Sequence, residues 1–172
     1  LISIWDPNGF DPNIIGDPQP PSWGHFFGTD DLGRDILLRI IYGGRVSLMV
    51  GVVSVGISVV IGMILGMVTG YLGGVFDEIM MRLVDLFMAI PTLFLILIIQ
   101  IQLEPSIYNV MIVIGLTSWM GVTRLVRAEV MSIKNRDFIT AAKARGISTR
   151  KLLIKHIFPH TLNPIIVAAM LG

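Results

Sequence analysis

Three uncharged apolar runs restrict the fold of this chain more than any other feature. They cover residues 46–70, 86–103 and 105–123. A helix needs roughly 20 apolar residues, within a range of about 17 to 25, to cross the hydrocarbon core of a bilayer. Each run is long enough, and a soluble domain of this size has too small an interior to bury all three. The sequence therefore predicts an all-α integral membrane protein with several spanning helices.

Composition agrees with this class. Hydrophobic residues make up 53% of the 172 residues, charged residues only 15%, and cysteine is absent. A further apolar run begins after Pro159 and is too short to span a membrane within this sequence. We expect residues 159–172 to be the start of another span, and the chain to be a fragment that lacks the end of the helical core.

The lysines and arginines predict the orientation of the spans. Three of them lie in residues 1–45, whereas ten lie on the opposite side of the predicted spans, nine of these between Arg124 and Lys155. Short loops rich in Lys and Arg stay in the cytoplasm. We therefore expect an extracytoplasmic segment over residues 1–45, three spans within residues 46–123, and a cytoplasmic loop over residues 124–158.

The basic loop has the pattern of two short helices. Residues 137–145 favour a helix, and Gly146 is placed to end it in the left-handed conformation. Ser148 is placed to begin a second helix, which Pro159 is expected to interrupt. The small side chains of Ala141 and Ala142 would let the first helix enter a groove of another protein. A solvated loop and attraction to lipid headgroups are the alternatives.

Glycine and proline predict how the spans pack. Gly62, Gly66 and Gly70 are spaced by four, so one face of the first span lacks side chains and permits close helix packing. Ordinary packing is the plainer interpretation, and a face that slides during transport is the alternative. Pro91 is expected to kink the second span.

Sites for catalysis, metals or phosphate find no support in the sequence. His156 and His160 have the spacing of a metal pair, but Pro159 lies between them and no Glu follows His156. The glycines of residues 70–74 lack the Lys-Ser/Thr of a phosphate loop. The apolar runs contain no ionisable group, which argues against a proton-driven carrier and an intramembrane enzyme. Glu78 and Arg82 have the spacing of a helical ion pair.

Part of the basic loop resembles a known family. The residues Thr140-Ala141-Ala142, the following Gly146 and the segment 157–159 (Ile-Phe-Pro) resemble the EAA loop of ABC importer permeases, which docks into an ATPase subunit. Thr140 stands where that family usually has glutamate. The resemblance implies an ATPase-coupling role for six residues: Thr140, Ala141, Ala142, Lys143, Arg145 and Gly146.

A second motif precedes the first span. It consists of Gly28, Thr29, Asp30, Gly33, Arg34 and Asp35. It resembles the corresponding segment of C-type permeases of dipeptide, oligopeptide and nickel importers, and the resemblance continues from His25 over most of the chain. Asp30 and Asp31 suit the start of a helix whose apolar residues would lie on the outer membrane surface. A structural role and contact with a binding protein are the two interpretations.

The resemblance implies a MetI-like, polytopic helical fold and a permease subunit of an ATP-driven importer of dipeptides or oligopeptides. The implied partners are a second permease subunit, two ATPase subunits, an extracytoplasmic substrate-binding protein and membrane lipid, with no nucleic acid. The chain itself would bind no cofactor and catalyse no reaction, since ATP and Mg would belong to the ATPases. The implied location is the cytoplasmic membrane of a bacterium or archaeon. Nickel, glutathione and oligosaccharides remain alternative substrates, and a membrane scaffold outside transport is the alternative from another class.

Overall fold

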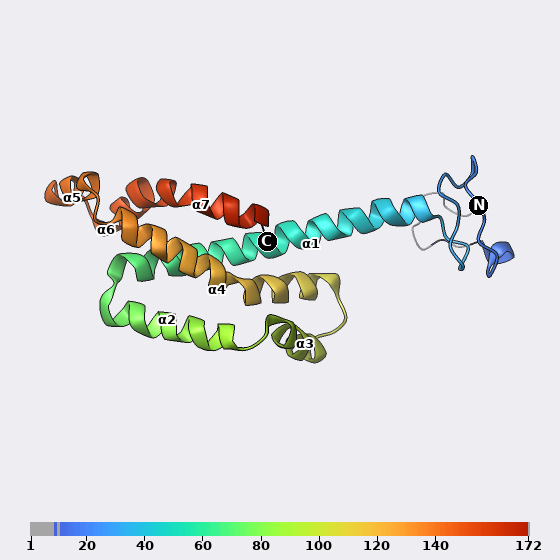
Figure 1. The fold of residues 1–172 in the computed structure, drawn as a ribbon, viewed down its shortest axis with the longest axis horizontal. Helices are drawn as coiled ribbons and strands as arrows, with labels where there is room; N and C mark the ends of the chain where they lie inside the picture. The colour runs from blue at the N-terminus through green and yellow to red at the C-terminus, as the bar shows by residue number, and fades with distance from the viewer. Residues whose placement is uncertain (1–8, 10, 172) are drawn as a thin grey trace. The chain divides into compact units, whose positions relative to one another are not determined.

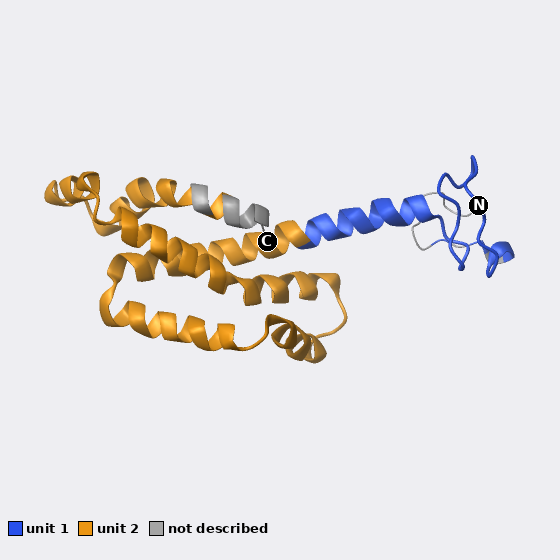
Figure 2. Ribbon diagram, viewed as in Figure 1, with its two compact units in different colours: residues 1–50 blue, residues 51–172 orange. Residues whose placement is uncertain are grey.

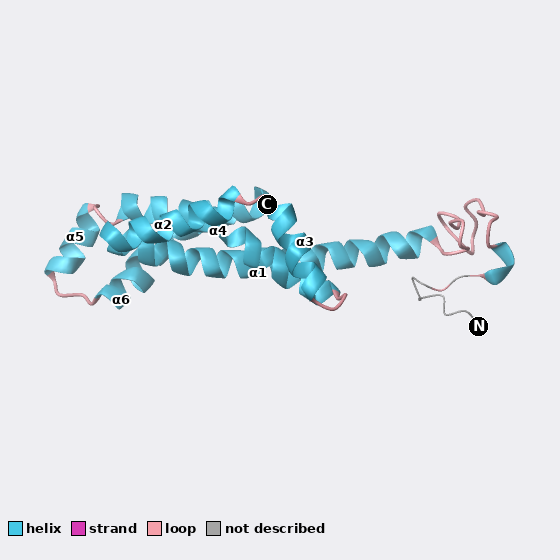
Figure 3. Cartoon of the chain, turned by 90° about the horizontal axis from the view of Figure 1, so that it is seen from below, coloured by secondary structure: helices cyan, strands magenta, loops and turns pink. Residues whose placement is uncertain are grey.

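The computed structural model describes residues 9 and 11–171, and within them the chain is helical and contains no β-strand (Figures 1 and 3). Its elements are η1 (Pro12–Ile14), α1 (Ile36–Leu72), α2 (Gly74–Ala89), α3 (Thr92–Gln102), α4 (Ile107–Ile133), α5 (Asp137–Ala144), α6 (Thr149–Leu152), η2 (Leu153–Ile157) and α7 (Phe158–Leu171). The prediction of an all-α fold is confirmed. The chain forms two compact units, residues 1–50 and 51–172 (Figure 2), which are described separately.

Two helices, α1 and α4, are long and apolar enough to cross a membrane. Both extend past the bounds that the apolar runs predicted. The helix α1 begins at Ile36 and does not break at residue 45, and α4 continues past Thr123 to Ile133. Charged side chains such as Arg45 and Arg124 end an apolar run, but they have good helix propensity and do not end a helix. The helices therefore continue past residues 45 and 123, and the division into membrane and extramembrane segments at these residues stays a prediction.

The predicted second span is a bent pair of helices. The axes of α2 and α3 differ by 81° across the break at Ile90 and Pro91. Pro91 has no N–H to donate to the carbonyl of Phe87, and it forces Ile90 into an extended conformation with φ −88° and ψ 124°. The kink expected at Pro91 is confirmed. Counted as one broken span, the pair gives three spans among the described residues.

The glycine face of α1 lies against α4. A Cβ atom built on Gly62, Gly66 or Gly70 would lie 2.5, 2.7 and 2.9 Å from the Cβ atoms of Val122, Val126 and Val130, respectively. Backbone carbonyls of α4 approach the same positions within 2.7–2.8 Å. Each valine thus fills the notch left by a glycine, which brings the two backbones together. This packing joins the part of α1 after residue 50 to α4 without room for a side chain.

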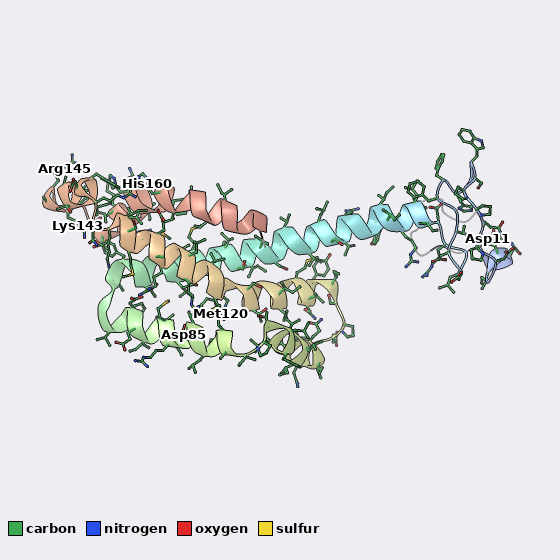
Figure 4. All side chains as sticks on the ribbon, in the orientation of Figure 1. Asp11, Asp85, Met120, Lys143, Arg145 and His160 are labelled. Carbon is green, nitrogen blue, oxygen red and sulfur yellow. The ribbon has the colours of Figure 1, made fainter. Side chains whose placement is uncertain are left out.

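Two long-range ion pairs join α2 to α4. Asp77 is 7% exposed and accepts hydrogen bonds from the Arg127 guanidinium, one of them at 2.6 Å. Asp85, labelled in Figure 4, pairs with Arg124 one turn away along α4. The sequence analysis missed both pairs because their partners are 50 and 39 residues apart in the chain. The predicted pair of Glu78 and Arg82 is also present, at 2.7 Å on the exposed face of α2.

Pro159 does not interrupt the last helix, contrary to the sequence analysis. The turn before it, η2, is π-helical, and the N–H of Phe158 donates to the carbonyl of Leu153, five residues earlier. In a regular α-helix the proline ring would clash with the carbonyl of Lys155, which would also lose its donor. The wider turn accommodates this, so α6, η2 and α7 follow one another without a loop.

Candidate functional site

The predicted coupling residues lie in a helical knob, residues 137–157, which contains α5, α6 and η2. The helix α5 ends in a Schellman motif. The N–H of Gly146 donates to the carbonyl of Lys143 at 2.9 Å, and the N–H of Ile147 donates to that of Ala142 at 3.3 Å. Gly146 has φ +73°, the left-handed conformation expected from the sequence. The sharp turn at Gly146 lets α6 follow α5 directly.

One face of α5 is buried against its own chain. Ile139 is 0% exposed and Ala142 is 1% exposed. The two residues are three apart and therefore share a helix face. They belong to a core cluster with residues of α4, α6, η2 and α7, namely Val126, Val130, Ile133, Leu152, Ile157 and Ile165. Ala142 is thus enclosed by its own chain, which favours a supporting role beneath the exposed face over entry into a partner's groove.

The opposite face of α5 and the turn after it are exposed. This face carries the other predicted coupling residues and adds Ala144: Thr140, Ala141, Lys143, Ala144, Arg145 and Gly146. Ala141 and Ala144 are three residues apart, so the face has two adjacent small side chains. The cations of Lys143 and Arg145, labelled in Figure 4, are their sequence neighbours. The sequence analysis did not select Ala144, although its spacing from Ala141 would have identified it.

The ammonium of Lys143 lies 5.3 Å from the centre of the Tyr71 ring, which is the geometry of a cation–π contact. Tyr71 is in the last turn of α1 and packs against the core cluster below α5. The knob therefore contacts a second predicted span as well as α4.

The N-terminal motif uses its polar groups within its own loop, in the unit of residues 1–50. The backbones of Thr29 and Asp35 form an isolated antiparallel β-bridge. The Asp30 carboxylate forms an ion pair with the Arg34 guanidinium at 2.8 Å. The hydrogen bond from Arg34 holds the pKa of the Asp30 carboxyl well below its usual value of 3.8. Gly28 and Gly33 have φ of +76° and +71°, and a Cβ on either would collide with a backbone carbonyl. These contacts favour the structural interpretation of the motif.

The helix break between α2 and α3 borders a cavity of about 160 Å³. Its lining contains three hydroxyl side chains among the residues Met88, Thr92, Thr117, Ser118, Met120 and Gly121. Irregular backbone at membrane depth is tolerated where it is covered by protein or lines a polar cavity. The Thr117 hydroxyl donates to the carbonyl of Val113 on its own helix, at 2.9 Å.

His160, one of the two histidines considered as a metal pair, lies beside an aromatic ring. The His160 ring lies 5.4 Å from the Phe138 ring, between α7 and α5. Throughout the described residues, no group of three or more His, Cys, Asp or Glu side chains is placed to hold a metal ion. This arrangement gives His160 a packing role.

Residues 58–172 match the family described as "Binding-protein-dependent transport system inner membrane component". The chain belongs to this family. The match includes the glycine face of α1, the bent pair of α2 and α3, and the whole knob. The resemblance to ABC importer permeases is thereby confirmed, and the helical permease fold has the family's support.

Curated relatives in this family include oligopeptide and dipeptide permeases. The chain is 38% identical to the oligopeptide transport system permease protein OppC of Bacillus subtilis, over 92% of this chain and 52% of the relative. It is 45% identical to OppC of Escherichia coli, over 86% and 49%. It is 42% identical to the dipeptide transport system permease protein DppC of Haemophilus influenzae, over 100% and 62%. The chain thus spans about half to three-fifths of these relatives' lengths.

Proposed function

We propose that this chain is part of the membrane permease subunit of an ATP-driven importer of dipeptides or oligopeptides. The spans α1 and α4 and the bent pair of α2 and α3 contribute to the translocation path, and the knob docks into a partner ATPase. The family and the names of its oligopeptide and dipeptide permeases support this assignment.

The two-sided burial of α5 is the observation that carries the docking role. Ile139 and Ala142 fix the helix to its own chain, while Ala141 and Ala144 remain on the exposed face. Small side chains let a short helix lie deep in a groove, and Arg145 beside them favours an acidic rim on the partner. This assignment keeps Thr140, Ala141, Lys143, Arg145 and Gly146 at the docking surface or its border and gives Ala142 to the support beneath it.

The complete importer has a second permease, two ATPase subunits and an extracytoplasmic binding protein that delivers the substrate. ATP and Mg belong to the ATPases, and this chain hydrolyses nothing. ATP binding closes the ATPase pair, and the movement passes through the knob to the spans. The two permease states must differ in their affinity for the nucleotide-bound ATPases, because a ligand shifts an equilibrium only by differential binding.

The proposed location is the cytoplasmic membrane, with the knob in the cytoplasm and the N-terminal motif outside. The excess of Lys and Arg in residues 124–155 supports this orientation. The cavity of about 160 Å³ beside the helix break is the part of the path proposed from the described residues.

Cysteine cross-linking tests the docking face directly, because these 172 residues contain no cysteine. Ala141→Cys should form a cross-link to the co-purified ATPase through a short bifunctional reagent. Ala142→Cys is the matched control, because its position is 1% exposed and faces the core. Equal cross-linking from both positions, or from neither, would reject the proposed docking face.

A further inference from the structure

Two lysines converge on the last turn of α1, which ends at Leu72. Lys134, the residue after α4, donates a hydrogen bond from its ammonium to the carbonyl of Gly70 at 2.8 Å. Lys143, on α5, places its ammonium 5.3 Å from the Tyr71 ring centre. The two contacts come from different elements and use different chemistry, yet they reach consecutive residues of α1.

The end of a helix suits such contacts for physical reasons. The last carbonyls of α1 have no donor within the helix, and the C-terminal end of its dipole carries partial negative charge. A lysine ammonium satisfies the Gly70 carbonyl, and a second ammonium nearby is attracted to the same end. The ring of Tyr71 adds the negative face of its quadrupole.

The packing around these contacts connects the end of α1 to α5 and to α4. Tyr71 is half-buried and packs against the core cluster that contains Ile139 and Ala142 of α5. Gly70 has no side chain, and a Cβ built on it would lie 2.8 Å from the Arg127 carbonyl oxygen and 2.9 Å from the Val130 Cβ on α4. A displacement of α5 therefore reaches α1 through Lys143 and Tyr71. The Lys134 contact joins the same turn of α1 to the end of α4, three residues before α5 begins.

We infer that Tyr71, Lys143 and Lys134 are positioning residues that transmit movement of the docking helix α5 to the end of α1. This inference rests on the proposed function, and it changes the role of Lys143. The family resemblance implies that Lys143 contacts the ATPase, whereas its ammonium is engaged over a ring of its own chain. Lys143 thus acts through α1, while Ala141 and Ala144 form the surface that meets the partner.

The test measures ATP hydrolysed per peptide imported in proteoliposomes containing the full-length protein, its partner permease, the ATPases and a peptide-loaded binding protein. Tyr71→Leu removes the ring and should raise this ratio about two- to five-fold, the population shift that a cation–π contact supports. Tyr71→Phe keeps the ring and should retain the wild-type ratio. Lys143→Met should raise the ratio as Tyr71→Leu does, and the double variant should be no worse than either single variant, because both remove the same contact.

Lys134→Met tests the second contact, with Lys134→Arg as the conservative variant that keeps a donor for the Gly70 carbonyl. Lys143 is exposed, so Lys143→Met also keeps the test valid if Tyr71→Leu does not fold. Wild-type ratios for Lys143→Met and Lys134→Met in a working importer would overturn the inference and leave the proposed function intact. A wild-type complex with no peptide-dependent ATP hydrolysis would instead overturn the proposed peptide import, and the inference with it.

Discussion

Replacing Gly66 by alanine should destabilise the protein more than the same change elsewhere on α1. A Cβ at this position would lie 2.7 Å from the Thr123 carbonyl oxygen, 2.7 Å from the Val126 Cβ and 3.0 Å from the Arg127 backbone nitrogen. All three atoms belong to the backbone or to the stiff base of a β-branched side chain, so α1 and α4 must move apart. Such overpacking costs about 1–3 kcal/mol. The unfolding temperature should fall accordingly.

Thermal unfolding of the full-length protein in detergent, followed by the fluorescence of its tryptophans, measures this difference. Gly56→Ala is the matched control, because Gly56 is on the same helix and a Cβ there meets nothing within 4 Å. The control should leave the unfolding temperature unchanged or raise it slightly, since alanine has the higher helix propensity. Equal unfolding temperatures for the two variants would refute the packing described for α1 and α4.

Three further predictions concern charge and backbone conformation. Arg127→Leu should lower the free energy of unfolding, measured in denaturant, by about 3 kcal/mol, because it leaves the buried Asp77 carboxylate unpaired. Adding Asp77→Asn should restore part of this loss, and wild-type stability of Arg127→Leu would contradict the prediction. The lowered pKa of Asp30 means that its ionised form stabilises the N-terminal loop above pH 3.8 and that this contribution is lost as the pH falls below that value. Asp30 stays ionised between pH 7 and 5, so its contribution to the protection of the loop amides from hydrogen exchange should not change over that interval. A loss of protection between pH 7 and 5 that Asp30→Asn abolishes would contradict the assignment. Gly146→Ala should lower the free energy of unfolding by about 1–2 kcal/mol through the strain of the left-handed conformation alone, because a Cβ there meets no atom within 4 Å. Gly146→Asn should lower it less, and equal unfolding free energies for the two variants would oppose this explanation.

Local chemistry made part of this fold predictable. Pro91 lacks a donor and restricts the residue before it, so the kink in the second predicted span follows from one residue. The end of α5 at Gly146 could also be predicted, because a glycine after a short helix provides the left-handed turn that ends it. The burial of Ala142 could also have been predicted, since Ala142 lies three residues from the apolar Ile139 and shares its helix face.

Other features depend on tertiary contacts that no local pattern specifies. Asp77 and Arg127 are 50 residues apart, and the sequence offers several equivalent cations for the same carboxylate. The helix continues through Pro159 because the turn before it is π-helical and accommodates the proline ring. The proline alone predicts a break, because in a regular α-helix its ring would clash with the carbonyl of Lys155. The contact between Lys143 and Tyr71 required knowledge of where α5 packs.

The same limits apply to the site. The residue types around Thr140 and Gly146 located the knob, because their spacing resembles that of a docking loop. They did not separate the face of α5 that supports the knob from the face that is free to meet a partner. That separation depends on which side of α5 the core cluster covers.

ATP hydrolysis by the reconstituted full-length protein, with its neighbouring permease and ATPases, is the most direct test of the proposed function. It should be measured with a candidate binding protein that is either empty or loaded with mixed peptides. Stimulation by the peptide-loaded protein alone is the predicted result. An assembled complex that responds to nickel, glutathione or oligosaccharides and ignores peptides would contradict the proposed substrate, and failure to assemble with any ATPase would contradict the role of the chain as an importer subunit.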